Sequence, residues 1–246
     1  MDFLDSFYVM LIVFGFASLG GFVGSFVAVP AILKKGINHF IAGILILAMS
    51  SELIPEALKT KLVWQPIVGF VAGTVVMFIL QIVSRKMQGA RSSSLNLALL
   101  GAVAIDFLVD GFLSIATYRL NESIGMLIVV VISIGSFFLM LSTANTFKSK
   151  ISTVYLIALT LLTTLSLIVG GIAGFFASSN QSPGFMSALL TFAAAAFLFL
   201  AVEELIPQAH ESASDEENKP KNLWIKSMLF GGFLLMLVFR IVQDNG

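Results

Sequence analysis

The chain has 246 residues, of which 58% are hydrophobic and only 11% are charged, and its formal net charge is zero. Soluble domains carry about 25% charged residues, so this composition, with a mean hydropathy of +0.99, predicts an integral membrane protein. The chain contains no cysteine, which excludes disulfides, iron–sulfur clusters and thiolate metal sites. The apolar stretches are continuous rather than alternating, which favours an all-α membrane protein over a barrel.

Eight apolar segments are long enough to cross a bilayer as helices. They are residues 7–33, 37–58, 64–84, 95–117, 123–147, 152–177, 183–207 and 222–242. The first follows Asp2 and Asp5 without a basic residue, so we expect it to remain as a span and not to act as a cleaved signal peptide. The connections are short, and we expect a single transmembrane domain over residues 1–246.

The fourth segment carries two acids near its middle, Asp106 and Asp110, followed by Gly111. Residues four apart share one face of a helix. A carboxylate at the centre of a bilayer costs roughly 2.5–3.5 kcal/mol and by default marks a transport pathway or a bound partner. The competing interpretation is a structural pair that is hydrogen-bonded to neighbouring Ser, Thr or backbone groups.

Basic residues are distributed unevenly between the two sets of connections. Ten lie in or beside the connections after the first, third, fifth and seventh segments, namely Lys34, Lys35, Arg85, Lys86, Arg91, Lys148, Lys150, Lys219, Lys221 and Lys226. Four lie on the opposite side, namely Lys59, Lys61, Arg119 and Arg240. The positive-inside rule places the larger group in the cytoplasm. Both termini of this multi-pass protein are then predicted to be non-cytoplasmic.

Three sequence blocks recur in the same order in the two halves of the chain. They pair residues 20–26 (GGFVGSF) with 170–176 (GGIAGFF), 51–57 (SELIPEA) with 203–209 (EELIPQA), and 73–83 (GTVVMFILQIV) with 232–242 (GFLLMLVFRIV). Each segment lies five positions after its partner in the order of spans, an odd number, so the two units must cross the membrane in opposite senses. We therefore expect inverted-topology repeats over about 7–84 and 152–242, with a central helix pair over about 95–147. Secondary transporters with such repeats bind substrate near the midplane.

This 3+2+3 layout of eight spans, together with three short motifs, resembles the ZIP family of divalent metal transporters. The motifs are residues 53–57 (LIPEA), residues 203–207 (EELIP) and Asp110-Gly111. They are similar to the family's His-Leu-Leu-Pro-Glu-Ala, its Glu-Glu-Leu-Leu-Pro and the acid-Gly that closes its fourth-span motif. The resemblance implies transport of a divalent cation through a site on the central helix pair.

The metal-binding positions of that family are only partly kept. Asp106 and Phe107 stand where the family has a His and an Asn or Ser, and Glu52 replaces the His before Leu-Leu-Pro. The fifth span offers Ser136 and Met140 but neither the Pro nor the carboxylate of the family motif. We therefore expect the fold of the family without its standard two-metal zinc site.

Oxygen atoms dominate the ligands that remain within the membrane. The only histidines, His39 and His210, lie at the ends of spans. The candidate site therefore consists of Asp106, Asp110 and Ser136, whose oxygen atoms suit Mg²⁺, Mn²⁺ or Ca²⁺ better than a soft metal.

Four further residues are secondary or gate candidates, namely Glu52, Glu204, Met140 and His210. Each has a competing interpretation. The two glutamates could simply reach the membrane interface, Met140 could be packing, and His210 could belong to a solvated acidic loop.

The sequence thus predicts a ZIP-like carrier whose substrate is a divalent cation, with no resident cofactor. A transporter of the same fold with a changed substrate, such as a proton-coupled small solute, stays open, as does a non-transporting membrane protein. No catalytic triad, His-Glu-x-x-His motif or phosphate-binding loop is found, so we do not expect an enzyme. The expected partners are the lipid bilayer and the cation, with a homodimer as one candidate assembly and no nucleic acid.

The orientation can be tested with single introduced cysteines, because the chain has none of its own. Asn121 lies between the fourth and fifth segments and Ser149 between the fifth and sixth. In intact cells, an Asn121→Cys variant should react with a membrane-impermeant maleimide, and a Ser149→Cys variant should react only after permeabilisation. Reversed labelling would overturn the predicted orientation.

Overall fold

The computed structural model describes residues 3–27, 30–89, 97–179, 182–207 and 221–245. These residues contain eight helices long and apolar enough to span a membrane, which confirms the prediction of a multi-pass, all-helical membrane protein. In chain order they are α1 (Phe3–Phe26), α2 (Ala31–Ala48), α4 (Trp64–Gly89), α5 (Leu97–Leu120), α6 (Glu122–Phe147), α7 (Thr153–Ala177), α8 (Pro183–Phe199) and α10 (Lys221–Asn245). Helix α2 continues through the π-helical segment η1 (Met49–Leu53) into α3 (Ile54–Leu58), and α8 continues into the π-helical segment η2 (Leu200–Leu205).

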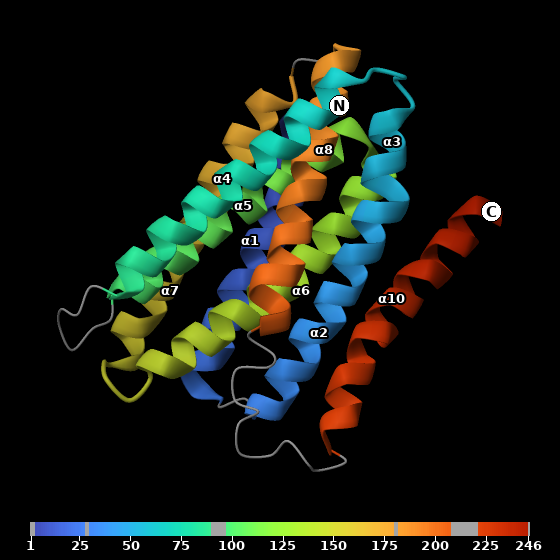
Figure 1. The fold of residues 1–246 in the computed structure, drawn as a ribbon. Coiled ribbons are helices and arrows are strands. Elements are labelled where there is room, and N and C mark those ends of the chain that lie inside the picture. The colour runs from blue at the N-terminus through green and yellow to red at the C-terminus, as the bar shows by residue number, and fades with distance from the viewer. Residues whose placement is uncertain (1–2, 28–29, 90–96, 180–181, 208–220, 246) are drawn as a thin grey trace.

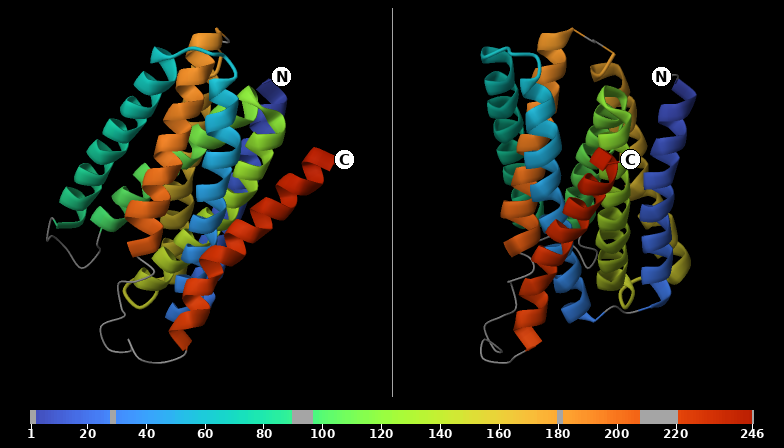
Figure 2. Two further views of the ribbon diagram at one scale, coloured as in Figure 1. Left: turned by 45° about the vertical axis from the view of Figure 1, so that its right-hand side comes forward. Right: turned by 90° about the vertical axis from the view of Figure 1, so that its right-hand side faces the viewer.

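Successive spanning helices run in opposite directions along one bundle (Figure 1). We call the end at which α1, α4, α6 and α8 finish the lower end, as Figure 1 draws it, and the opposite end the upper end. Segment η1 therefore lies toward the upper end, and η2 lies toward the lower end. Helices α4 and α10 lie on the outside of the bundle, beside α8 and α2 respectively (Figure 2).

The first two helices divide at a different place from the expected segments 7–33 and 37–58. Helix α1 ends at Phe26, and Pro30 directly precedes α2. Proline fixes φ and lacks an amide hydrogen, so it is tolerated at the start of a helix but not in its interior. Lys34 consequently lies in the first turn of a spanning helix and not in a connection.

Two prolines account for the π-helical segments. Pro55 and Pro207 follow the sequence Leu-Ile in both places, directly after η1 and η2. A proline has no amide hydrogen to donate to the carbonyl four residues earlier, so the regular ladder is interrupted at that point. π-helical turns inside α-helices occur often at functional sites.

Four helix pairs make the largest contacts in the bundle: α1 with α6, α5 with α7, α2 with α10, and α4 with α8. Glycines let these backbones approach closely. A methyl group on Gly20 of α1 would collide with the Phe137 carbonyl oxygen of α6, and one on Gly170 of α7 would collide with the Leu108 carbonyl oxygen of α5. These contacts join α6 to α1 and α5 to α7, and α1 and α7 also contact each other.

A Gly20→Ala substitution should destabilise the bundle, because the added methyl group meets the backbone of α6. Overpacking of this kind costs about 1–3 kcal/mol. Gly15→Ala on the same helix is the matched control, since nothing lies within 4 Å of the added carbon and Ala favours a helix by about 1 kcal/mol over Gly. Thermal unfolding in detergent should give a lower midpoint for Gly20→Ala only. Equal midpoints would contradict the close approach of α1 and α6.

Candidate functional site

A cavity of about 90 Å³ lies between α2, α4, α5, α6 and the α8–η2 helix. Its lining comes from the middle of α5 and α6, from α2 and the second half of α4, and from η2, so it extends from the middle of the bundle toward the lower end. The polar part of this lining consists of Asp106 and Asp110 from α5, Glu204 from η2, Lys34 and Asn38 from α2, and Gln81 from α4. One water molecule needs roughly 10–15 Å³ of such space. The cavity therefore has room for a partly hydrated ion or a small solute.

The two aspartates of α5 both line this cavity, as their spacing of four residues predicts. Asp110 lies near the middle of α5, and its Oδ2 atom accepts a hydrogen bond of 3.1 Å from Ser136 Oγ on α6. Asp106 lies one turn closer to the lower end and makes no hydrogen bond or ion pair with the described part of the chain. The structure thus places all three residues of the candidate site at one junction of α5 and α6.

Glu204 is a third carboxylate on the same cavity. It repels both aspartates electrostatically, and Arg85 near the end of α4 attracts it. No three His, Asp or Glu side chains within the described ranges converge closely enough to hold one metal ion together. A cation in this cavity would therefore bind few carboxylates at once and keep water among its ligands, as Mg²⁺ commonly does.

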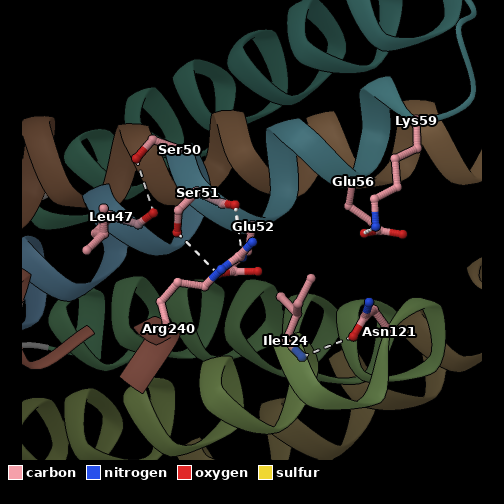
Figure 3. A network of polar contacts seen from close by, with 9 residues as sticks. All are labelled: Leu47, Ser50, Ser51, Glu52, Glu56, Lys59, Asn121, Ile124 and Arg240. Carbon is pink, nitrogen blue, oxygen red and sulfur yellow. Dashed lines mark hydrogen bonds and ion pairs between the residues drawn. The ribbon is translucent and has the colours of Figure 1, made fainter. Parts of the chain in front are cut away.

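Glu52 lies away from the cavity, toward the upper end of the bundle. Its buried carboxylate forms an ion pair with Arg240 of α10, and Ser51 Oγ donates a hydrogen bond of 3.3 Å to Glu52 Oε1 (Figure 3). Arg240 also donates over 3.3 Å to the Ser51 carbonyl, which lacks its usual helical partner because residue 55 is proline. One arginine thus neutralises a buried acid, satisfies a free carbonyl and joins α10 to α2.

The remaining secondary candidates do not contribute described side chains to the cavity. Met140 is fully buried, and its Cγ atom packs against Gly21 of α1, so its thioether fills the interface between α1 and α6. His39 is buried on α2, with Nδ1 3.1 Å from the Lys35 carbonyl oxygen. His210 lies outside the described residues.

Sequence reasoning misses three polar residues of the cavity lining, namely Lys34, Asn38 and Gln81. Because the sequence pattern places Lys34 in a connection, it does not predict that this residue lines a cavity. The signal that could have found it is Pro30, because a helix that begins there places Lys34 and Asn38 four residues apart on one face of a spanning helix. Gln81 could have been noticed as an uncharged polar residue within an apolar span.

No protein-family model matches this chain, and no curated protein matches it. We therefore infer its function from the chemistry and geometry of the cavity, and the similarity of its short motifs to the ZIP family enters as a hypothesis.

Replacing Arg240 by Gln should destabilise the protein, because Glu52 stays buried without a counter-ion and the Ser51 carbonyl loses a donor. Loss of one partner from a fully buried ion pair costs roughly 3–5 kcal/mol. The Arg240 side chain is 34% exposed, so we expect the free energy of unfolding to fall by about 2 kcal/mol in a titration with SDS.

The matched control is Lys59→Gln. Lys59 pairs with Glu56 over 2.6 Å (Figure 3), but its side chain is 71% exposed. Exposed pairs contribute about 0–1 kcal/mol, so this variant should unfold almost as the unmodified protein does. Equal losses in the two variants would contradict the structural role assigned to Arg240.

Proposed function

We propose that this chain is a membrane transporter of ZIP-like architecture that moves a divalent cation through the cavity beside α5. The observation that carries the proposal is the pair of carboxylates, Asp106 and Asp110, that line one cavity inside a bundle of membrane-spanning helices. Ionised groups at this depth are costly unless a cation or a partner neutralises them. Two carboxylates together balance the charge of one divalent cation.

The ligand atoms favour a hard cation. Asp106, Asp110 and Glu204 offer carboxylate oxygens, Ser136 lies beside Asp110, and Asn38 adds an amide. The chain has no cysteine, and no histidine belongs to the described lining of the cavity. Oxygen ligands suit Mg²⁺, Mn²⁺ or Ca²⁺, and we propose a cation of this class as the substrate.

The transport cycle that we propose depends on an inverted repeat, which the helix contacts support. One unit would consist of α1, α2 and α4 and the other of α7, α8 and α10, with α5 and α6 exchanged between them. Under this exchange the α1–α6 contact corresponds to α7–α5, and the α2–α10 contact corresponds to α8–α4. The π-helical segments η1 and η2 correspond too, and they lie toward opposite ends of the bundle (Figure 1).

Two basic side chains support the same relation. Arg119 in the last turn of α5 donates a hydrogen bond of 2.5 Å to the Phe175 carbonyl near the end of α7. Lys148, directly after α6, donates a hydrogen bond of 2.6 Å to the carbonyl of Phe26, the last residue of α1. Each central helix would thus satisfy the free carbonyls at the end of the first helix of one unit.

The conformation fits one state of an alternating-access cycle. The cavity extends from the middle of the bundle toward the lower end, which the positive-inside rule predicts to be cytoplasmic. Toward the upper end, Leu53 and Ile128 are fully buried and Arg240 pairs with Glu52. In the proposed cycle the two units rock about α5 and α6 and open the aspartate pair to each side in turn.

A second candidate function is proton-coupled transport of a small zwitterionic solute. Lys34 favours it, because it is a basic residue on the same cavity as the carboxylates. An ammonium group repels a metal ion but would bind the anionic group of such a solute, while the carboxylates bind its cationic group.

Replacing Asp106 or Asp110 by Asn keeps the side-chain shape and removes one charge from the cavity. Each variant should bind the cation at least tenfold more weakly, a loss of about 1.4 kcal/mol, and the double variant should not transport. We expect the larger loss at Asp110, which keeps the acid-Gly position of the family it resembles. The measurement is Mn²⁺ uptake into proteoliposomes, with Mg²⁺ and Ca²⁺ as competitors.

Glu122→Gln is the matched control, because Glu122 is exposed at the start of α6 and does not line the cavity. It should transport at the unmodified rate. Uptake by the double Asp variant at that same rate would make the acid pair structural and would transfer the search to Glu52 and Glu204. Uptake of a zwitterionic solute down a proton gradient, with no uptake of any divalent cation, would select the second candidate.

A further inference from the structure

Lys34 is the only basic residue in the described lining of the carboxylate cavity. The same side chain also lines a second cavity of about 50 Å³, together with Ser142 and Asn145 near the end of α6. Its Nζ atom donates a hydrogen bond to Ser142 Oγ. The ammonium group is therefore bound on the side of the smaller cavity, although the side chain borders both.

Lys34 lies between the two cavities. Phe138 is the other described residue that lines both of them, so the lysine stem and the Phe138 ring form their common wall. The backbone of Lys34 is held in the first turn of α2, whereas its four-carbon stem is flexible and carries three rotatable donors. Rotation of the side chain alone can move the ammonium group from one cavity toward the other.

When the carboxylate cavity holds no cation, its carboxylates must be neutralised by protonation or by a counter-ion. Asp106, Asp110 and Glu204 repel one another across it, and buried charges without a partner are strongly destabilising. Ser136 gives Asp110 one hydrogen bond but brings no charge. Lys34 is the basic side chain in the described lining of this cavity, and Arg85, which attracts Glu204, does not line it.

We propose that Lys34 is a tethered counter-ion that alternates with the transported cation. Its ammonium group occupies the carboxylate cavity when the cation has left, and it returns to Ser142 in the smaller cavity when a cation binds. This inference rests on the proposed cation transport. Lys34 thereby weakens cation binding by competition and offsets part of the negative charge of the empty site, which favours the conformational change of the empty carrier.

The first test is the affinity of the purified protein for Mn²⁺, measured from the electron paramagnetic resonance signal of free Mn²⁺. Lys34→Gln removes the competing charge, so the Kd should fall by at least about fivefold, the effect of one unit charge a few ångströms away. Lys35→Gln is the matched control, because it removes the same charge from the neighbouring residue, which lines neither cavity. Its affinity should stay close to that of the unmodified protein.

Ser142→Ala should act in the opposite direction. It removes the hydrogen-bond acceptor that holds the ammonium group in the smaller cavity. The ammonium group should then occupy the carboxylate cavity for a larger fraction of the time, and Mn²⁺ should bind more weakly. In a Lys34→Gln, Ser142→Ala double variant this effect should disappear, and the affinity should match that of Lys34→Gln alone. If Lys34 had only a structural role, the two single variants would not change the Mn²⁺ affinity in opposite directions. Nor would Lys34→Gln abolish the effect of Ser142→Ala in the double variant.

Transport gives an independent measurement. The Lys34→Gln variant should keep exchange of Mn²⁺ for Mn²⁺ across proteoliposomes, because the loaded carrier is unaffected, and should lose most of its net uptake, because the empty carrier keeps unbalanced charge. If Lys34→Gln proves unable to fold, the weaker Mn²⁺ binding expected of Ser142→Ala still tests the proposal.

The aspartate variants distinguish failure of the proposed cation transport from failure of the proposed counter-ion role of Lys34. If Asp106→Asn with Asp110→Asn abolishes Mn²⁺ binding while Lys34→Gln behaves as Lys35→Gln does, cation transport stands and the counter-ion role of Lys34 is wrong. If the double Asp variant binds Mn²⁺ as the unmodified protein does, both are wrong. Tighter binding by Lys34→Gln with weaker binding by Ser142→Ala supports the counter-ion.

Discussion

The bilayer core offers no water to polar groups, so every buried charge and every free carbonyl of this protein must be satisfied by the protein or by a ligand inside it. The junction of α2 and α10 is one solution to this constraint. Pro55 leaves the Ser51 carbonyl without a helical partner, and Arg240 satisfies it while it neutralises Glu52. The acids near the middle of α5 and on η2 differ, because they line a cavity that the proposed cation would occupy.

The two glutamates that precede the Ile-Pro pairs illustrate this contrast. In the proposed repeat Glu52 corresponds to Glu204, and Arg240 of the third helix of one unit corresponds to Gln81 of the other. The upper pair is an ion pair, whereas the lower pair places a carboxylate and a neutral amide on the cavity. The equivalent positions thus differ in charge, because the upper acid has its own counter-ion and the lower acid lines the cavity.

The proposed chemistry also gives a reason for the departures from the ZIP motifs. Asp106 stands where the family that the chain resembles has a histidine, so in the proposed site it would supply an oxygen ligand in place of a nitrogen ligand, which would favour a hard and partly hydrated cation over zinc. The carboxylates do not converge as a three-ligand metal centre among the described residues. Weak, water-rich coordination suits a carrier, because a transported ion must leave as readily as it binds, and the proposed return of Lys34 would promote that release.

Local patterns in the sequence determined the eight spans and the shared face of Asp106 and Asp110, because hydropathy and helical periodicity act over a few turns of one segment. The prediction that Ser136 lies near the aspartates came from the resemblance to the fifth-span motif of the ZIP family, and the structure places its Oγ 3.1 Å from Asp110 Oδ2. Tertiary packing alone decided that Glu204 shares the cavity while Glu52 pairs with Arg240, almost two hundred residues away. Tertiary packing also decided that Lys34 borders two cavities. The side chain lies near the start of α2, and the cavities that it lines depend on how α2 packs against α6.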